Sequence, residues 1–113
     1  MAVTPEYRAF VLEQLGRVVP VTSRAMFGGV GIYSEGMIFG LMDDDITYLK
    51  VDDSNRGDFA AKGMGPFNPF DDPKAVMQYY ELPADLLEDA DALRPWVAGA
   101  LDAARAARRR KKR

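Results

Sequence analysis

Cysteine and histidine are both absent from this chain of 113 residues. Without cysteine there is no disulfide, no thiolate metal site and no cysteine nucleophile. Without histidine the chain lacks the commonest general base and the commonest zinc ligand, and a Ser-His-Asp arrangement is excluded. Any catalysis would depend on carboxylates, lysine or tyrosine, and any metal would need oxygen ligands. We therefore expect no cofactor and no metal centre.

Long hydrophobic runs are missing as well. No apolar run approaches the roughly 18 to 20 residues that a membrane-spanning helix needs, and the N-terminal residues lack the basic region and apolar stretch of a secretory signal. We therefore expect no contact with a membrane and a cytoplasmic location. The hydrophobic share of 48% and the aromatic share of 11% are sufficient for a single domain with one core.

The net charge of −2 conceals an uneven distribution of charge along the chain. Residues 105–113 hold seven of the 15 basic groups and no acid, so this segment carries +7. The other eight basic groups face all 17 acidic groups in residues 1–104, which gives that part a charge of −9. We therefore expect a domain over residues 1–104 and a basic C-terminal tail over 105–113, and such asymmetry is typical of an interaction feature.

Helical patterns occur near both ends of the chain. Thr4, Pro5 and Glu6 have the order of a helix start, with a capping hydroxyl, a proline and an acid, and Gly16 favours an end there. The apolar side of this first helix is predicted to be Tyr7, Phe10, Val11 and Leu15. A final helix should begin within about a turn before Pro95, with Asp89 or Asp91 near its start. Its apolar stripe is Leu93, Trp96, Val97, Ala100, Leu101 and Ala104.

Residues 23–51 read as an antiparallel meander with turns at 34–36 and 43–45. A short helix is predicted over 52–62, and a fifth strand over 76–82. The strands are apolar on both faces, so we expect helices to cover one face and a second subunit or a long segment to cover the other. The predicted fold class is α+β: an N-terminal helix, a curved antiparallel sheet of about five strands and C-terminal helices.

The segment from Arg24 to Tyr33 contains three glycines among strand-forming residues. Glycine inside a strand is costly, and it marks a bulge, a bend or the close approach of another segment. The alternative is a phosphate-binding loop. Such a loop should lead into a helix and supply a lysine and a hydroxyl, whereas these glycines lead into another strand. We therefore expect special backbone geometry here rather than a phosphate site.

Several pieces of the chain, in their order and spacing, resemble the N-terminal domain of the TfoX/Sxy proteins. The matching pieces are Arg-Ala-Met-Phe-Gly-Gly-Val-Gly-Ile-Tyr at 24–33, Gly-Met-Ile-Phe at 36–39, Tyr-Leu-Lys at 48–50, Pro-Phe at 66–67, Met-Gln-Tyr-Tyr at 77–80, Leu-Pro at 82–83 and Trp-Val-Ala-Gly-Ala at 96–100. Gly-Gly alone would carry no information about family, but this series extends over about 100 residues.

The resemblance implies an α+β fold of the secretion-chaperone-like type and a link to competence regulation in bacteria. The regulators for which the family is named carry a second, C-terminal domain resembling helix-hairpin-helix modules. This chain is expected to be a stand-alone first domain followed by its basic tail, so the competence role is not carried over to it. The family domain supplies no catalytic residues to transfer.

Two basic residues, Arg24 and Lys50, lie inside the predicted sheet. Either they line a shared anion or partner site on one face, or each pairs separately with a carboxylate or extends to solvent. A small enzyme would need them gathered with Tyr33 or Tyr48 and a carboxylate.

Two other groups of residues have an alternative interpretation. The triplet Asp43–Asp45 could hold a divalent cation, but it lacks the ligand spacing of an EF-hand, and a solvated turn is favoured; the same holds for Asp71-Asp72. The pairs Tyr79-Tyr80 and Phe67/Phe70 could stack on bases, but packing is favoured because no basic residues are interleaved with them.

The basic tail has two interpretations of equal weight. It contacts the phosphates of a nucleic acid without base specificity, or it is a solvated end that offsets the acidic domain. The candidate nucleic-acid contacts are Arg105, Arg108, Arg109, Arg110, Lys111, Lys112 and Arg113. Taken together, the sequence favours a non-catalytic regulatory domain that acts through protein–protein contacts, as a homodimer and with an unknown protein partner. Nucleic-acid binding through the tail and a small enzyme are the alternatives.

Overall fold

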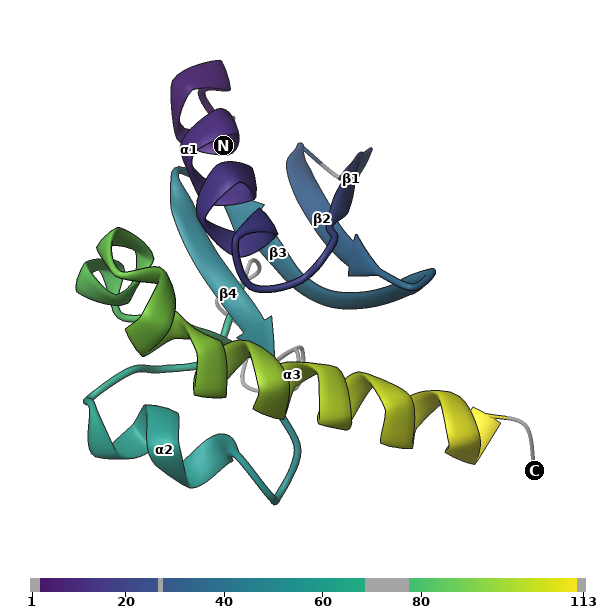
Figure 1. Cartoon of the computed structure of the whole chain (residues 1–113). Helices are drawn as coiled ribbons and strands as arrows, with labels where there is room; N and C mark the ends of the chain where they lie inside the picture. Colours follow the sequence, from purple (N-terminus) through teal and green to yellow (C-terminus); the bar gives the residue numbers. More distant parts are fainter. Residues whose placement is uncertain (1–2, 27, 69–77, 112–113) are drawn as a thin grey trace.

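A five-stranded antiparallel sheet organises the part of the chain that the computed structural model describes, residues 3–26, 28–68 and 78–111 (Figure 1). Neighbouring strands in the sheet are also neighbours in sequence, as a meander requires. The elements are α1 (Pro5–Gly16), β1 (Thr22–Met26), β2 (Gly29–Ser34), β3 (Met37–Asp43), β4 (Ile46–Lys50), α2 (Arg56–Ala61), β5 (Tyr79–Glu81), the 3₁₀ helix η2 (Ala84–Glu88) and α3 (Ala90–Lys111). The predicted α+β fold class is confirmed.

Helix α1 begins and ends where its sequence predicts. The Thr4 hydroxyl accepts a hydrogen bond from the backbone N–H of Tyr7 at 3.2 Å, and proline occupies the first turn. The prediction for Phe10 was wrong, because this side chain is 40% exposed while Val11 and Leu15 are fully buried. The buried side of the helix is centred on Val11 and Leu15, and Phe10 lies about 100° away from Val11 around the axis.

The first two turns predicted within the meander are two-residue hairpin turns. Glu35 and Gly36 have φ angles of 53° and 76°, and Asp44 and Asp45 have φ angles of 52° and 56°. Positive φ at both central residues matches the twist of the flanking strands. Between β2 and β3 the register shifts at Ile32/Tyr33, so β3 contains a bulge that bends the sheet.

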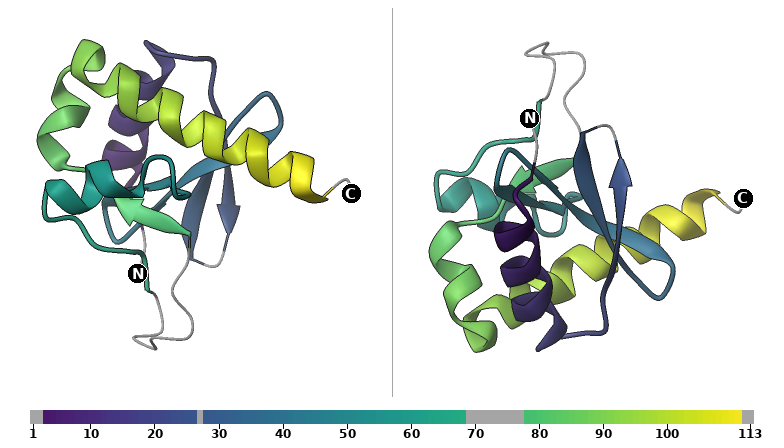
Figure 2. Two further views of the ribbon diagram at one scale, coloured as in Figure 1. Left: turned by 90° about the horizontal axis from the view of Figure 1, so that it is seen from below. Right: turned by 90° about the horizontal axis from the view of Figure 1, so that it is seen from above.

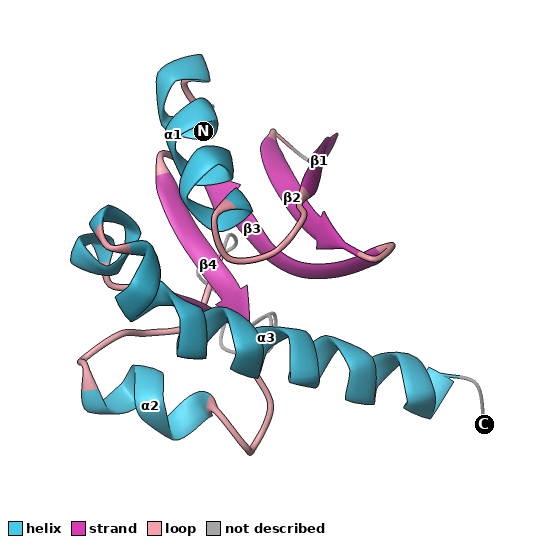
Figure 3. Cartoon of the chain, viewed as in Figure 1, coloured by secondary structure: helices cyan, strands magenta, loops and turns pink. Residues whose placement is uncertain are grey.

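Helices α1 and α3 lie over the same face of the sheet and enclose the hydrophobic core (Figures 1 and 2). Figure 3 separates these cyan helices from the magenta strands. The core residues that are fully buried include Val11, Leu15, Ile32, Phe39, Met42, Leu49, Leu93, Val97 and Ala100. Helical cover of one sheet face, as predicted from the apolar strands, is therefore confirmed.

The chain after β4 differs in detail from its prediction. Helix α2 starts at Arg56 rather than near residue 52, because Asp52 directs the preceding residues into a turn. Helix α3 starts after Asp89, whose carboxylate accepts hydrogen bonds from Asp91 and Ala92, and it continues through most of the basic segment to Lys111. Strand β5 is shorter than predicted, and residues 76 and 77 lie outside the described residues. None of the helices in the described part of the chain is long and apolar enough to cross a membrane.

Candidate functional site

The face of the sheet that points away from α1 and α3 carries both predicted sheet residues, Arg24 in β1 and, two residues after Tyr48 in β4, Lys50. Arg24 in β1 lies opposite Gly31 in β2, and Gly31 lies opposite Leu41 in β3. Leu41 in turn lies opposite Tyr48 in β4. Residues directly opposite each other in neighbouring strands point to the same face, so these four positions form a row across the second face.

A patch of half-exposed apolar side chains surrounds Gly31 on this second face. A Cβ atom at Gly31 would lie 2.7 Å from Met26 Sδ, 3.1 Å from Tyr33 Cε1 and 3.3 Å from Ile38 Cδ1. Because Gly31 has no side chain, the side chains of Met26, Tyr33 and Ile38 can approach one another above it. This close approach is the reason for a glycine at position 31. The guanidinium of Arg24 lies over the Tyr33 ring, 5.4 Å from its centroid. We call Arg24, Met26, Tyr33 and Ile38 the sheet-face patch.

The other end of this face is covered by the segment around Phe67. The Phe67 ring packs against Tyr48 with centroids 4.7 Å apart, and the Phe67 N–H donates to the Tyr79 carbonyl at 2.7 Å. At this end of the face Leu41 and Tyr79 are buried, with exposed fractions of 6% and 7%. A chain segment therefore covers this end of the face, while cover by a second subunit stays a prediction. The predicted packing role holds for Phe67. Phe70 lies outside the described residues.

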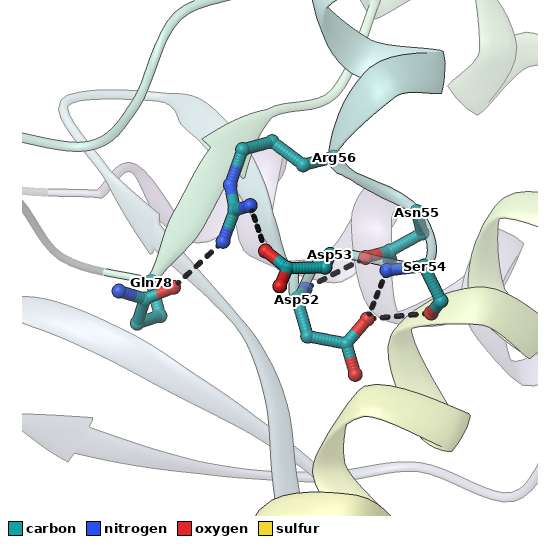
Figure 4. Close-up of polar contacts among 6 residues, drawn as sticks. All are labelled: Asp52, Asp53, Ser54, Asn55, Arg56 and Gln78. Carbon is teal, nitrogen blue, oxygen red and sulfur yellow. Dashed lines mark hydrogen bonds and ion pairs between the residues drawn. The ribbon is translucent and has the colours of Figure 1, made fainter.

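A cleft of about 410 Å³ lies where β4, α2, β5 and α3 meet (Figure 4). It contains two of the predicted site residues, Lys50 and Arg110, together with a third cation that the sequence analysis did not single out, Arg56. Its complete lining is Lys50, Val51, Asp52, Asp53, Arg56, Gln78, Ala103 and Arg110. The cleft therefore brings three basic side chains from different parts of the sequence close to the carboxylates of Asp52 and Asp53.

Asn55 fixes the loop that forms one wall of the cleft. It is only 6% exposed; its Oδ1 accepts from the Asp52 N–H at 2.8 Å, and its Nδ2 donates to the Lys50 carbonyl at 3.1 Å. A Cβ atom at Gly99 of α3 would lie 3.4 Å from Asn55 Cβ, so α3 lies next to this residue. Residue type gives no signal for this role, because the partners of Asn55 are backbone groups.

Both carboxylates of the cleft already have partners. Asp52 accepts hydrogen bonds from the Ser54 hydroxyl and the Ser54 N–H, and Arg110 and Arg56 are positively charged neighbours. The hydrogen bond from the Ser54 hydroxyl is the main cause that holds the pKa of Asp52 below its ordinary value. Partial burial opposes it, and the Ser54 N–H, Arg110 and Arg56 add to it. Asp53 binds Arg56 Nη1 at 2.6 Å, and Arg56 Nη2 donates to Gln78 Oε1 at 3.2 Å (Figure 4).

Arg24 and Lys50 lie at different places on the sheet. Lys50 Nζ is 5.0 Å from the centroid of the Tyr79 ring, on a strand three steps from β1. At about 4.8 Å per step, the two backbones are about 14 Å apart. An enzyme site would have needed Arg24, Lys50, Tyr33 or Tyr48 and a carboxylate. The cleft contains Lys50 and the carboxylates of Asp52 and Asp53, whereas Arg24 and Tyr33 belong to the sheet-face patch and Tyr48 packs on Phe67.

The acidic triplet in the β3–β4 turn binds the start of α1. Asp45 Oδ1 accepts from the Thr4 N–H at 2.8 Å, and Asp45 Oδ2 accepts from the Thr4 hydroxyl at 3.0 Å. The sequence suggested a solvated turn or a cation site, and neither includes this contact. Among the residues that the structure describes, no group of three or more acidic side chains is arranged to hold a metal ion.

The predicted nucleic-acid contacts do not share one environment. Arg105 pairs with Asp102 at 3.1 Å and lies 3.8 Å from Glu35 in the β2–β3 turn. Arg108, Arg109 and Arg110 are exposed near the end of α3, which extends past the sheet (Figure 1). Lys111 is the last residue of the helix, and Lys112 and Arg113 lie outside the described residues.

Comparison with known proteins gives one result for most of the chain. A family model of the TfoX N-terminal domain matches residues 13–104. The match begins within α1, covers the whole sheet and ends in α3, next to the basic segment. No curated protein with detectable sequence similarity was found.

Proposed function

The chain belongs to the TfoX N-terminal domain family, and from that premise we propose that it is a non-catalytic regulatory domain that acts through protein–protein contacts. A second copy of the chain is one of the partners in this proposal, and a further protein is another. The cytoplasmic location predicted from the sequence belongs to the same proposal.

The observation that supports this proposal is the sheet-face patch. Met26, Tyr33 and Ile38 are half-exposed on a face that carries no helix within the described residues. Apolar and aromatic side chains beside an arginine are the residue types that protein interfaces favour. Arg24 is stacked on Tyr33, so its planar charge is already oriented for a partner's carboxylate or backbone. Arg24 and Lys50 remain predicted contact residues.

The test is capture of partners from an extract of the native host by the full chain. We expect specific proteins to be retained by the wild-type chain and lost with Ile38→Lys, because a charge in the centre of the patch opposes burial. Ala9→Lys is the matched control, since Ala9 is an exposed position on α1. Thermal unfolding must show that both variants fold. Identical retention by the wild type and Ile38→Lys would contradict the proposal.

Binding of nucleic acid by residues 105–113 is a second candidate, favoured by the exposure of Arg108, Arg109 and Arg110. Arginines on a projecting helix end can reach phosphates, and their binding would weaken steeply with salt. Deleting residues 105–113 should abolish retention on DNA or RNA at low salt. If the intact chain is not retained at all, this second function is wrong.

A further inference from the structure

Helix α3 carries opposite charges at its two ends. Its 22 residues give it a length of about 33 Å. Exposed acids surround its beginning, and arginines occupy its last two turns. The acids at the beginning are Asp85, Glu88, Asp89 and Asp91, beside one arginine, Arg94, which pairs with Asp91 at 3.4 Å. The basic residues of the last two turns are Arg105, Arg108, Arg109, Arg110 and Lys111. When two such helices lie antiparallel, the acidic end of each helix therefore lies beside the basic end of the other.

The spacing of two of these charges places them on one side of α3. Asp91 and Arg109 are separated by 18 positions, which corresponds to five helical turns and about 27 Å. Pro95, Ala98, Asp102 and Arg105 lie between them at alternating intervals of four and three residues, which is the spacing of a coiled-coil stripe. We call these six positions the outer stripe.

The outer stripe faces solvent. The Asp91 side chain is 92% exposed and that of Asp102 is 73% exposed. Pro95, Ala98 and Arg109 are exposed, and Arg105 is partly so. Helix α3 runs along one side of the molecule, and no other described element covers its outer side (Figures 1 and 2). Ala98, near the middle of the stripe, has a small side chain that permits the close approach of another backbone.

We propose that the outer stripe pairs with the outer stripe of a second copy of this chain, the two α3 helices running antiparallel. A twofold axis near residue 100 places Asp91 level with Arg109 of the second copy, and Ala98 level with Asp102 of the second copy. Every contact then occurs twice, as in any isologous dimer. The pairing is complementary because each helix supplies the charge that its partner needs at both ends.

This dimer rests on the proposed role in protein contacts and identifies the surface for one of them. Its ion pairs are exposed, so the association is weak and depends on salt. Nucleic acid would use the basic end alone, and Asp91, which also pairs with Arg94 at 3.4 Å, would take no part in that contact. The charge complementarity of the complete stripe therefore favours a second copy, and nucleic-acid binding becomes an outcome that the experiment detects.

Sedimentation equilibrium of the full-length chain tests the proposal by a charge exchange. The wild type should associate at low salt and dissociate at about 0.5 M salt. Arg109→Asp and Asp91→Arg should each raise the dimer dissociation constant about tenfold or more, because each replaces two attractive contacts by two repulsive ones. The double variant Asp91→Arg/Arg109→Asp should recover salt-sensitive association, even if one single variant folds poorly.

Arg17→Asp is the matched control, because Arg17 is an exposed, ion-paired arginine directly after α1; this variant should dimerise like the wild type. A monomeric wild type at low salt overturns the proposal, and so does a dimer that both single variants leave unchanged. If Arg109→Asp abolishes retention on DNA without changing the sedimenting mass, the stripe serves nucleic acid and the proposal is also wrong. Failure here leaves the sheet-face patch untouched, since Ile38→Lys reports on that contact separately.

Discussion

Gly29 and Gly31 lie on the same face of β2, but their surroundings differ. A Cβ at Gly29 would overlap the backbone carbonyl oxygen of Met42, whereas the nearest atom at Gly31 is the flexible thioether of Met26. Gly29→Ala should therefore lower the free energy of unfolding by about 2–3 kcal/mol, and Gly31→Ala by less than about 1 kcal/mol. Urea denaturation measures both. Equal losses at the two positions would show that backbone crowding does not distinguish them.

Asn55 is the buried polar residue on which the cleft wall depends. Asn55→Ala removes the partners of the Asp52 N–H and the Lys50 carbonyl, and it should cost about 1–3 kcal/mol of unfolding free energy. Asn55→Asp keeps an acceptor for the N–H but turns a second oxygen toward the carbonyl, so it should be destabilised at least as much. A change below about 0.5 kcal/mol in either variant would contradict the role assigned to the amide.

At this scale the sequence predicts residues whose role depends on near neighbours. The capping role of Thr4 follows from local pattern, and it is confirmed. Phe10 was wrongly predicted to be packed, because helical spacing does not determine how wide the buried side is. Asn55 and Arg56 were missed because their partners are a backbone carbonyl and the distant Gln78.

The contact between the β3–β4 turn and α1 joins two elements that are distant in sequence. Thr4 caps α1 and also donates twice to Asp45, so Thr4→Ala and Asp45→Ala should each cost about 1 kcal/mol. The double variant should lose less than the sum, because both changes remove the hydrogen bond from the Thr4 hydroxyl to Asp45. Chemical denaturation of the four proteins gives the coupling.

Asp44→Ala is the matched control for this contact. Asp44 and Asp45 both have positive φ, at 52° and 56°, so an alanine meets a similar backbone penalty at either position. The larger loss should occur at Asp45. If Asp44→Ala destabilises the chain equally, the turn conformation rather than the contact with α1 is the source of the effect.

The bounds of elements follow from local signals where such signals exist. Turn residues set the hairpins, and proline with a capping hydroxyl sets the start of α1. The start of α2 was predicted too early, because Asp52 and Ser54 form a turn with each other instead of capping the helix. This turn is also held by the buried Asn55, which accepts a hydrogen bond from the Asp52 N–H and lies next to Gly99 of α3.

Stability of the whole molecule should fall in alkaline solution through three tyrosines. Burial raises the pKa of Tyr7, Tyr48 and Tyr79 above the ordinary value of 10.0, and nearby negative charges add to the effect for Tyr7 and Tyr48. The unfolded chain ionises first, so this stabilisation is complete below about pH 10 and is lost as the pH rises through the folded pKa values.

Denaturation between about pH 9 and 11 should show this loss of unfolding free energy. Tyr79→Phe keeps the ring beneath Lys50 and removes the ionising hydroxyl, so its loss over the same range should be smaller than that of the wild type. An identical pH dependence in the two proteins would mean that Tyr79 ionises equally easily in the folded and unfolded chains.

The fold as a whole could be predicted from sequence because its strands pair with their neighbours along the chain. A meander needs only local turns to specify the order of its strands. The two candidate surfaces could not be predicted in the same way. Arg24 and Lys50 lie on the same face of the sheet but three strands apart, so Arg24 belongs to the patch and Lys50 to the cleft.

Site-specific photo-cross-linking in the native host tests the proposed protein contacts most directly. A photoreactive phenylalanine analogue is placed at Tyr33 in the sheet-face patch and, as a control, at Ala9 on α1. The account predicts discrete cross-linked proteins from position 33 after illumination and none of them from position 9. No cross-linked protein from position 33, or the same products from both positions, would contradict it.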